Sequence, residues 1–279
     1  MRKIKIVTDS CLDLPDELIE KYNIEVLPVL VNFAEESYLD RVEITFEEMQ
    51  DKIKREGILP TTAQITPARF EEYFRKNIEE GYTVLAILMS SNMSGTYNSA
   101  CIAKDIIESD DIMIVDTKVI TSAQGYLVLK ACELRDKGLT ALEIKEEIEK
   151  LSPKIKASLC FESLENLVRG GRISKTAGAI GTALGLRIIV GFEDGKMGVV
   201  DKIRGNKKVI KRIISDYENS KPNKEEPVII VEAVNPELTA ELKKYFDENN
   251  IRYIKTEVGC TVGIHSGERA GGIFFVSEE

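Results

Sequence analysis

The chain has 279 residues and a formal net charge of −9 at pH 7, with 43% hydrophobic and 30% charged residues. This length fits one large domain or two of ordinary size, and this composition is typical of globular rather than disordered proteins. The acidic balance argues against a protein that coats nucleic acid. A single histidine, His265, excludes a metal site built from several histidines and any catalytic scheme that needs two.

The cysteines and the N-terminus bear on the compartment. The five cysteines are far apart and form no CxxC pair, so neither a zinc ribbon nor a thioredoxin-like redox motif is predicted. Scattered thiols are typical of a reducing cytosol. The apolar run near the N-terminus is too short for a signal peptide, and no stretch reaches the length of a membrane helix. The sequence therefore predicts a cytoplasmic protein with no dedicated metal site.

Strands alternate with helices through the first half of the chain. Hydrophobic patterning predicts strands over residues 4–8, 24–31, 84–89 and 112–115. It predicts helices over residues 16–22, 45–55, 67–79, 96–109, 122–137 and 142–151. Thr45 and Glu48 have the spacing of a capping box, and Thr66 before Pro67 is a typical helix start. This alternation favours a parallel sheet covered by helices.

The pattern changes near residue 153. Strands are predicted over residues 157–161, 187–192, 197–202, 228–233, 253–258 and 272–276, and helices over 209–217 and 236–249. Asp194-Gly195 between two of these strands is a strong hairpin signal. We therefore expect an N-terminal α/β domain with a parallel sheet (residues 1–153) and a C-terminal α+β domain with a mainly antiparallel sheet (residues 154–279).

Hydroxyl-bearing residues cluster where the predicted strands of the first domain end. They follow the strands in three groups, which are Thr8-Asp9-Ser10, the segment SSNMSGT at residues 90–96, and Asp116-Thr117 with Ser122. Ligands of open parallel sheets bind outside the carboxyl ends of the strands, where helix N-terminal amides favour anions. The same side chains are also common helix N-caps, and both interpretations stay open. The segment lacks the Lys and the glycine spacing of a P-loop.

Two further segments and one charge block are candidates for binding. Arg169-Gly-Gly-Arg172 is either a pair of guanidinium groups for an anion or a charged turn. The glycine-rich segment 258–267 is expected to be a loop, in which His265 has either a structural or a binding role. Residues 154–215 hold 13 Lys and Arg against five Asp and Glu, a net charge of +8 against −17 elsewhere. This block is either a docking surface for an acidic partner or a set of unrelated solvated side chains.

Seven segments, in order along the whole chain, together resemble the DegV family of bacterial fatty-acid-binding proteins. The first four are TDSCLDLP at 8–15, TAQITPARF at 62–70, SSNMSGTYNSA at 90–100 and the DT motif beginning at Asp116. The others are LENLVRGGRIS at 164–174, DGK at 194–196 and the closing glycine segment that ends in GIFF at 272–275.

The resemblance implies two domains with a long-chain fatty acid buried between them. It implies that the carboxylate is held by Thr62, by Ser94 with Gly95, and by His265, with Arg169 nearby. It implies no catalytic residue in this chain and no cofactor besides the bound lipid. A further hypothesis is that His265 changes between its neutral and protonated forms and so tunes the charge of the bound carboxylate.

The resemblance also implies a partner. In the family, the lipid carrier is a non-catalytic subunit of a fatty acid kinase, and a separate ATP-dependent kinase subunit phosphorylates the bound carboxylate to an acyl-phosphate. Arg172, Lys202 and Arg204 are then expected to dock this kinase, and an anionic membrane surface is a second, transient partner. No nucleic acid is expected. The alternatives are a lipid carrier or sensor without a kinase, and a hydrolase that uses Ser94 with a nearby base.

The sequence departs from the family pattern at three places. Ala63 and Ile65 replace a Ser and a Pro in the segment of Thr62, and Ile188 replaces a Pro. Glu268-Arg269 replaces a Pro-Gly pair after the His265 segment. These changes leave the acyl-chain preference and the conformation of the covering loops open.

Overall fold

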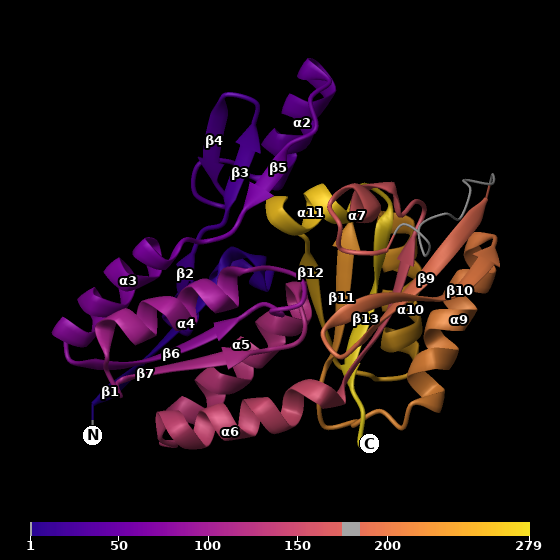
Figure 1. Ribbon diagram of the computed structural model, residues 1–279. Coiled ribbons are helices and arrows are strands. Elements are labelled where there is room, and N and C mark those ends of the chain that lie inside the picture. The colour runs from indigo at the N-terminus through magenta and orange to yellow at the C-terminus, as the bar shows by residue number, and fades with distance from the viewer. Residues whose placement is uncertain (1, 175–184) are drawn as a thin grey trace. The chain divides into compact units, whose positions relative to one another are not determined.

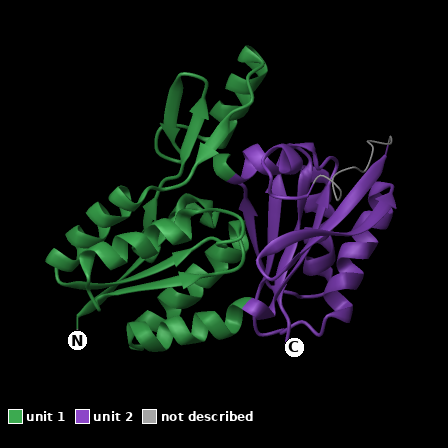
Figure 2. Ribbon diagram, in the orientation of Figure 1, with its two compact units in different colours: residues 1–152, 259–261 green, residues 153–258, 262–279 purple. Residues whose placement is uncertain are grey.

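The computed structural model describes residues 2–174 and 185–279 (Figure 1). The chain divides into two compact units, which are described separately (Figure 2). Unit 1 comprises the chain up to Ser152 together with Gly259–Thr261, and unit 2 comprises Pro153–Val258 and Val262–Glu279. Residues 259–261, which the sequence analysis placed in the second domain, thus pack with the first half of the chain.

Unit 1 is built on a four-stranded parallel sheet with the strand order β2-β1-β6-β7. Its strands are β1 (Lys3–Asp9), β2 (Glu25–Leu27), β6 (Tyr82–Leu88) and β7 (Ile112–Asp116). Its helices are α1 (Asp16–Lys21), α3 (Pro67–Glu79), α4 (Thr96–Ile107), α5 (Thr121–Asp136) and α6 (Ala141–Leu151), with a short 3-10 turn η1 (Ser10–Leu12). Helices α3 and α4 pack together on one face of the sheet, and α5 and α6 on the other (Figure 1). This double cover explains why residues 84–88 of β6 are continuously apolar, and it confirms the predicted parallel α/β class.

The single strand predicted over residues 24–31 is wrong. The chain forms two strands there, because Pro28 has no N–H to continue a ladder and β2 ends at Leu27. The second strand, β3 (Leu30–Phe33), belongs to a separate antiparallel sheet with the order β4-β3-β5. Its other strands are β4 (Glu36–Leu39) and β5 (Thr61–Ala63). No predicted strand corresponds to β4 or β5 of this small sheet, which carries Thr62.

The predicted helix starts in this region are confirmed. Helix α2 (Phe46–Glu56) begins with a capping box, in which Thr45 accepts from the Glu48 amide at 3.3 Å and Glu48 accepts from the Thr45 amide at 2.8 Å. Helix α3 begins at Pro67, with Thr66 as its cap. The Lys52 Nζ of α2 lies 5.2 Å from the ring centre of Phe33 in β3, so α2 packs against the small sheet.

Unit 2 is built on a six-stranded sheet with the order β10-β9-β8-β13-β11-β12. The strands are β8 (Ile155–Phe161), β9 (Leu186–Glu193), β10 (Lys196–Arg204), β11 (Val228–Ala233), β12 (Tyr253–Glu257) and β13 (Ala270–Val276). Only β11 and β12 pair in parallel, so the predicted mainly antiparallel sheet is confirmed. Strands β9 and β10 form the predicted hairpin. A 3-10 turn, η2 (Ser152–Lys154), precedes β8.

Helices α9 (Asn206–Asn219) and α10 (Pro236–Glu248) cover one face of this sheet. Their apolar side chains, such as Ile213 and Phe246, meet Ile273 and Phe275 of β13 in one buried cluster. A Cβ atom at Gly272 of β13 would lie 2.2 Å from the Ser158 carbonyl oxygen. The glycine in this strand therefore permits the close approach of β13 to β8.

The described residues of unit 2 also form two short helices, and neither was predicted. Helix α7 (Glu165–Arg169) follows β8. The segment 258–267, predicted to be a glycine-rich loop, instead contains helix α11 (Cys260–Ser266), whose first two residues belong to unit 1. Across the described part of the chain, no helix is both long and apolar enough to cross a membrane.

Candidate functional site

The strand-end hydroxyls of unit 1 serve mainly to hold neighbouring loops together. The Thr8 hydroxyl donates to the Ile87 carbonyl oxygen at 2.7 Å. Asp9 accepts from the Met89 amide at 2.9 Å and from the Cys11 amide at 3.0 Å. Both side chains are fully buried, and burial raises the pKa of Asp9. Thr8 and Asp9 therefore brace the edge of the sheet.

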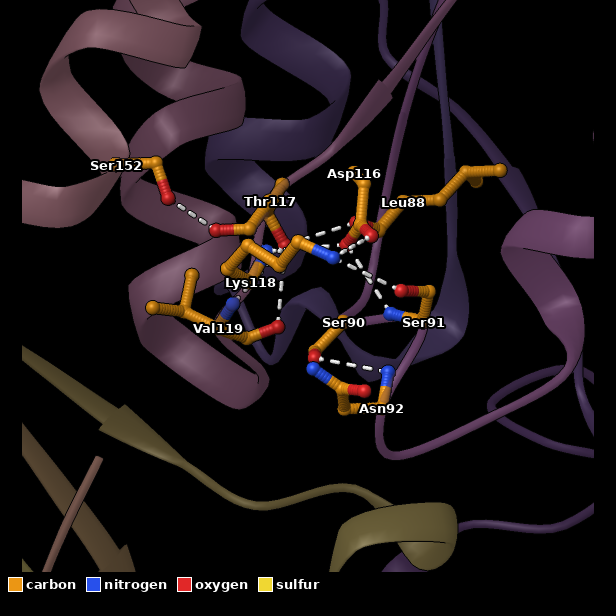
Figure 3. Close-up of polar contacts among 9 residues, drawn as sticks. All are labelled: Leu88, Ser90, Ser91, Asn92, Asp116, Thr117, Lys118, Val119 and Ser152. Carbon is orange, nitrogen blue, oxygen red and sulfur yellow. Dashed lines mark hydrogen bonds and ion pairs between the residues drawn. The ribbon is translucent and has the colours of Figure 1, made fainter. Parts of the chain in front are cut away.

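The DT motif holds the loop that follows β6 (Figure 3). Asp116 accepts from the Ser91 amide at 3.0 Å and from the Lys118 Nζ at 2.5 Å, and the Thr117 hydroxyl donates to the Leu88 carbonyl oxygen at 2.8 Å. Partial burial raises the pKa of Asp116, but hydrogen bonds from Lys118 and Ser91 outweigh it and lower this pKa overall. Asp116 is thus an ionised anchor for the loop that leads to Ser94.

Ser94 and Gly95 lie at the start of α4. The Ser94 Oγ accepts from the Thr96 amide at 3.2 Å and lies 3.0 Å from the Thr96 hydroxyl. A Cβ atom at Gly95 would lie 1.9 Å from the Gln64 Oε1, so only glycine allows Gln64 to lie across this turn. Gln64 also donates to the Ser99 hydroxyl at 3.0 Å.

Gln64, which was not among the predicted site residues, directly follows the strand that carries Thr62. Thr62 is a half-buried residue of β5, where it pairs with Val31 of β3. Because Gln64 contacts the start of α4, the Thr62 segment and the Ser94 turn lie close together in unit 1. The structure therefore brings together the two segments of the first half that carry Thr62 and Ser94, the hydroxyls that the family resemblance assigns to the carboxylate.

His265 and the Arg169–Arg172 turn meet in unit 2. A Cβ atom at Gly170 would lie 2.4 Å from the His265 Nδ1, so the imidazole packs directly on this turn. Burial, then the charges of Arg172 and Arg169, lowers the pKa of His265 to about 4. This environment favours the neutral imidazole when no anion is bound, and the hypothesis that the ring changes charge beside a bound carboxylate stays a prediction.

The two arginines of this turn differ in exposure. Arg169, the last residue of α7, is exposed. Arg172 is half-buried, and its guanidinium donates to the Gly170 carbonyl oxygen. Their shared effect on the imidazole means that the turn sets a positive potential at His265, which favours an anionic ligand over a cationic one.

Arg269, which stands where the family pattern has glycine, takes part in a group of ion pairs in unit 2. Glu162, just after β8, pairs through Oε1 with Arg187 at 3.0 Å and through Oε2 with Arg269 at 2.8 Å. Arg269 has a left-handed backbone with φ of 60°. The segment after His265 is therefore tied to the end of β8 by a charged pair, where the family pattern has glycine.

The expected docking residues Lys202 and Arg204 lie on β10, an edge strand of the unit 2 sheet. Both are exposed, and because they are two residues apart they point to the same side of the strand. Other cations of the basic block are neutralised locally, since Arg212 pairs with Asp201 and with Asp216. Residues 175–184 of this block lie outside the described residues.

The described residues offer no metal centre, because no group of three or more His, Cys, Asp or Glu side chains among them could hold an ion. A cavity of about 470 Å³ in unit 2 lies at the first turns of α9 and α10, with Cys160, Val209 and Leu238 in its lining. Its lining includes neither His265 nor Arg169. It is therefore distinct from the residues expected to hold a carboxylate.

Comparison with known proteins places these features in a family. The family model "Uncharacterised protein, DegV family" matches residues 3–278. A DegV domain-containing protein of Clostridium acetobutylicum is 48% identical over 278 residues, which covers 100% of both chains.

Two solved structures are similar over nearly the whole chain. One, described by its fatty acid binding, is a DegV family protein from Thermus thermophilus, with a TM-score of 0.90 and 29% identity over 99% of this chain and 100% of that one. The other is DegV, a fatty acid binding protein from Bacillus subtilis, with a TM-score of 0.87 and 28% identity over 100% of both chains. The motifs, the fold and these matches agree, and the chain belongs to the DegV family.

Proposed function

We propose that this chain binds one long-chain fatty acid, with its acyl chain buried, and presents the carboxylate to a separate ATP-dependent kinase subunit. The observation that carries the proposal is the position of His265, whose ring packs on Gly170 and lies in the positive potential of Arg169 and Arg172. A carboxylate suits this environment because it offsets both charges and accepts a hydrogen bond from the ring. The similar proteins described as fatty acid binding support the choice of a lipid.

The carboxylate is held by the hydroxyls of Thr62 and Ser94, the Gly95 amide and the His265 imidazole, with Arg169 adding charge. Hydrogen bonds to an ionised group are worth about 1.5–3 kcal/mol each, so several are enough to offset the cost of burying one carboxylate. Gly95 supports this role because it is the N-cap residue of α4, where the helix dipole favours an anion.

The acyl chain supplies the affinity and the selection by length. Burying a methylene group contributes about 0.8 kcal/mol, which corresponds to about fourfold in the dissociation constant. Affinity should therefore rise steeply from octanoate to palmitate.

The kinase step needs no nucleotide site in this chain, and the sequence has no P-loop. A carboxylate oxygen attacks the γ-phosphorus of ATP, the bond from this phosphorus to the β–γ bridging oxygen breaks, and the products are acyl-phosphate and ADP. Arg172, Lys202 and Arg204 dock the kinase subunit. This chain's part is to bind, orient and shield the lipid while the partner supplies ATP.

The test uses the full chain, stripped of lipid, in titrations with octanoate and palmitate. We expect palmitate to bind far more tightly, and mass spectrometry of lipid extracted from freshly purified protein to find a long-chain fatty acid. If palmitate does not bind and no long-chain fatty acid is found in the extract, the proposal is overturned. In a second step, the loaded protein is mixed with ATP and a cognate kinase subunit, and acyl-phosphate is trapped with hydroxylamine. Binding without acyl-phosphate, when the kinase is active on another carrier, would favour a carrier without a kinase.

A further inference from the structure

Two buried carboxylates hold the residues by which the end of the chain returns to unit 1. Asp13 Oδ1 accepts from the Gly259 amide at 2.8 Å, and Asp13 Oδ2 accepts from the Thr121 hydroxyl at 2.6 Å. Asp13 and Asp40 are each 1% exposed. These contacts therefore belong to the core of unit 1, where a charge is costly and a hydrogen bond is strong.

Asp40 caps the start of α11, although 220 residues separate it from Cys260. Its Oδ1 accepts from the Cys260 amide at 3.2 Å, and its Oδ2 accepts from the Thr261 amide at 3.2 Å and from the Thr261 hydroxyl at 2.5 Å. The Ser10 hydroxyl donates to the same Oδ2 at 2.9 Å. A carboxylate that accepts from the first amides of a helix acts as its N-cap. Asp40 thus fixes the first turn of the helix that carries His265.

The backbone around this cluster is specialised for these contacts. A Cβ atom at Gly259 would lie 3.0 Å from Asp13 Oδ1 and 3.7 Å from Asp40 Oδ1, so a side chain there would push the two carboxylates away. Asp13 and Thr121 both have a left-handed backbone, with φ of 45° and 54°. For a β-branched residue such as Thr this conformation is strained, and it persists only where the surroundings enforce it.

Among the described residues, no positively charged side chain lies close enough to Asp13 to form an ion pair with its carboxylate. Within the described residues, no Lys, Arg or His hydrogen-bonds to Asp13 or Asp40, and Arg41 instead donates to the Leu14 carbonyl oxygen and pairs with Asp16. The other titratable groups around the cluster are Asp9, Cys11 and Cys260.

Burial raises the pKa of Asp13 to about 7, and the charge of Asp40 acts in the same direction. Hydrogen bonds from Thr121 and Gly259, together with Arg41, limit this rise. Burial in this cluster therefore favours the protonated form of Asp13 at acidic pH.

We propose that Asp13 and Asp40 are positioning residues for His265, forming a clamp on residues 259–261 that closes with uptake of one proton. Opening of the clamp admits water to Asp13, which then ionises at its ordinary acidity and releases the proton. By linkage, acidification favours the closed clamp, and a rise in pH favours opening until Asp13 is ionised in both forms. The effect on ligand binding rests on the proposed fatty-acid function, whereas the clamp itself does not.

The clamp is tested by hydrogen exchange of the full chain, followed by mass spectrometry of peptides that cover residues 258–264. The Gly259, Cys260 and Thr261 amides are the donors to the two carboxylates, so their exchange reports opening directly. After correction for intrinsic exchange, we expect the opening constant to rise by up to about tenfold per pH unit between pH 5 and 7 and then to level off. The variant Asp13→Asn should give a flat profile, because its amide does not ionise.

Controls and a second variant keep the test decisive. Asp105→Asn, at an exposed position of α4, should keep the wild-type profile. Thr261→Val removes one donor to Asp40 and should raise opening at every pH without changing the slope. A flat wild-type profile, or the same slope in Asp13→Asn as in the wild type, would overturn the clamp.

The link to the ligand has its own readout. Palmitate affinity is measured at pH 6 and pH 8 for the wild type and for Asp13→Asn. We expect the ratio of the affinity at pH 6 to the affinity at pH 8 to be larger in the wild type, because only there does the clamp tighten on acidification. The titration of palmitate itself affects both proteins equally and cancels in this comparison. Equal ratios would overturn the positioning role. If palmitate binds neither protein, the proposed function fails, while the exchange profile still decides whether the clamp exists.

Discussion

Gly170 and His265 pack so closely that a methyl group on Gly170 would lie 2.4 Å from Nδ1 and 2.8 Å from Cε1 of the imidazole. The end of α7 thus meets α11 at a point where only a glycine fits. The turn between Arg169 and Arg172 therefore has two roles, since it supplies the positive potential at His265 and the surface on which the ring lies.

Replacement of this glycine should displace the imidazole. We predict that Gly170→Ala lowers palmitate affinity at least about tenfold, because the ring loses its position and its hydrogen bond to the carboxylate. As His265 is the single histidine of the chain, its NMR signals are unambiguous and should shift in the variant. Gly198→Ala is the matched control, because no atom lies within 4 Å of a Cβ built there. Unchanged affinity together with unchanged histidine signals would show that the ring does not depend on Gly170.

The charge state of His265 is open to direct titration. The pKa of the ring should be about 4, against an ordinary value of 6.5, and should rise when palmitate binds because the carboxylate stabilises the imidazolium. A base whose pKa is lowered by folding binds fewer protons than the unfolded chain between these two values. The protein is therefore fully stable with respect to this group above pH 6.5, and its free energy of unfolding falls by up to about 3–4 kcal/mol as the pH drops to 4 and below.

NMR titration of the ring with and without palmitate measures this shift. Arg172→Gln removes one of the two charges that act on the imidazole and should raise its pKa toward the ordinary value. A pKa near 6.5 in the folded wild type, or no response to palmitate, would contradict the proposed environment.

Local patterns in the sequence predicted the framework of both units. The apolar run of β6, the capping box at Thr45 and the hairpin at Gly195 each involve residues close together in the chain, and each is confirmed. The order of short motifs, rather than any one of them, indicated the family, and the comparisons confirm it.

The features that the sequence did not predict depend on contacts between residues far apart in the chain, or on a single proline that interrupts a strand. Pro28 splits one predicted strand between two sheets, and no periodicity reveals the second sheet. The glycines before His265 suggested a loop, but capping by Asp40 from far along the chain makes α11 helical there. The Asp13–Gly259 bond joins residues 246 positions apart, and a single sequence carries no local signal for such a pair.

The role of Thr62 can be separated from the stability of its strand. Thr62→Val keeps the shape and the strand preference of the side chain but removes the hydroxyl, so palmitate affinity should fall about tenfold or more. Thr61→Val is the matched control, since Thr61 is an exposed neighbour in the same short strand and should bind palmitate as the wild type does. Calorimetric titration of both variants provides the comparison. An equal loss of palmitate affinity in the two variants would mean that the strand, rather than the Thr62 hydroxyl, determines binding.

Docking of the kinase subunit should depend on charge at the edge strand β10. Exposed cations on an edge strand also discourage strand-to-strand aggregation, so their presence alone does not establish a partner. We predict that the double variant Lys202→Glu with Arg204→Glu keeps palmitate affinity but lowers acyl-phosphate formation at subsaturating carrier, and that added salt reduces the wild-type rate toward that of the variant. Lys224→Glu with Lys244→Glu makes the same change of charge at other exposed positions of unit 2 and should leave the rate high. If both double variants lose activity equally, the net charge of the carrier rather than β10 governs the encounter.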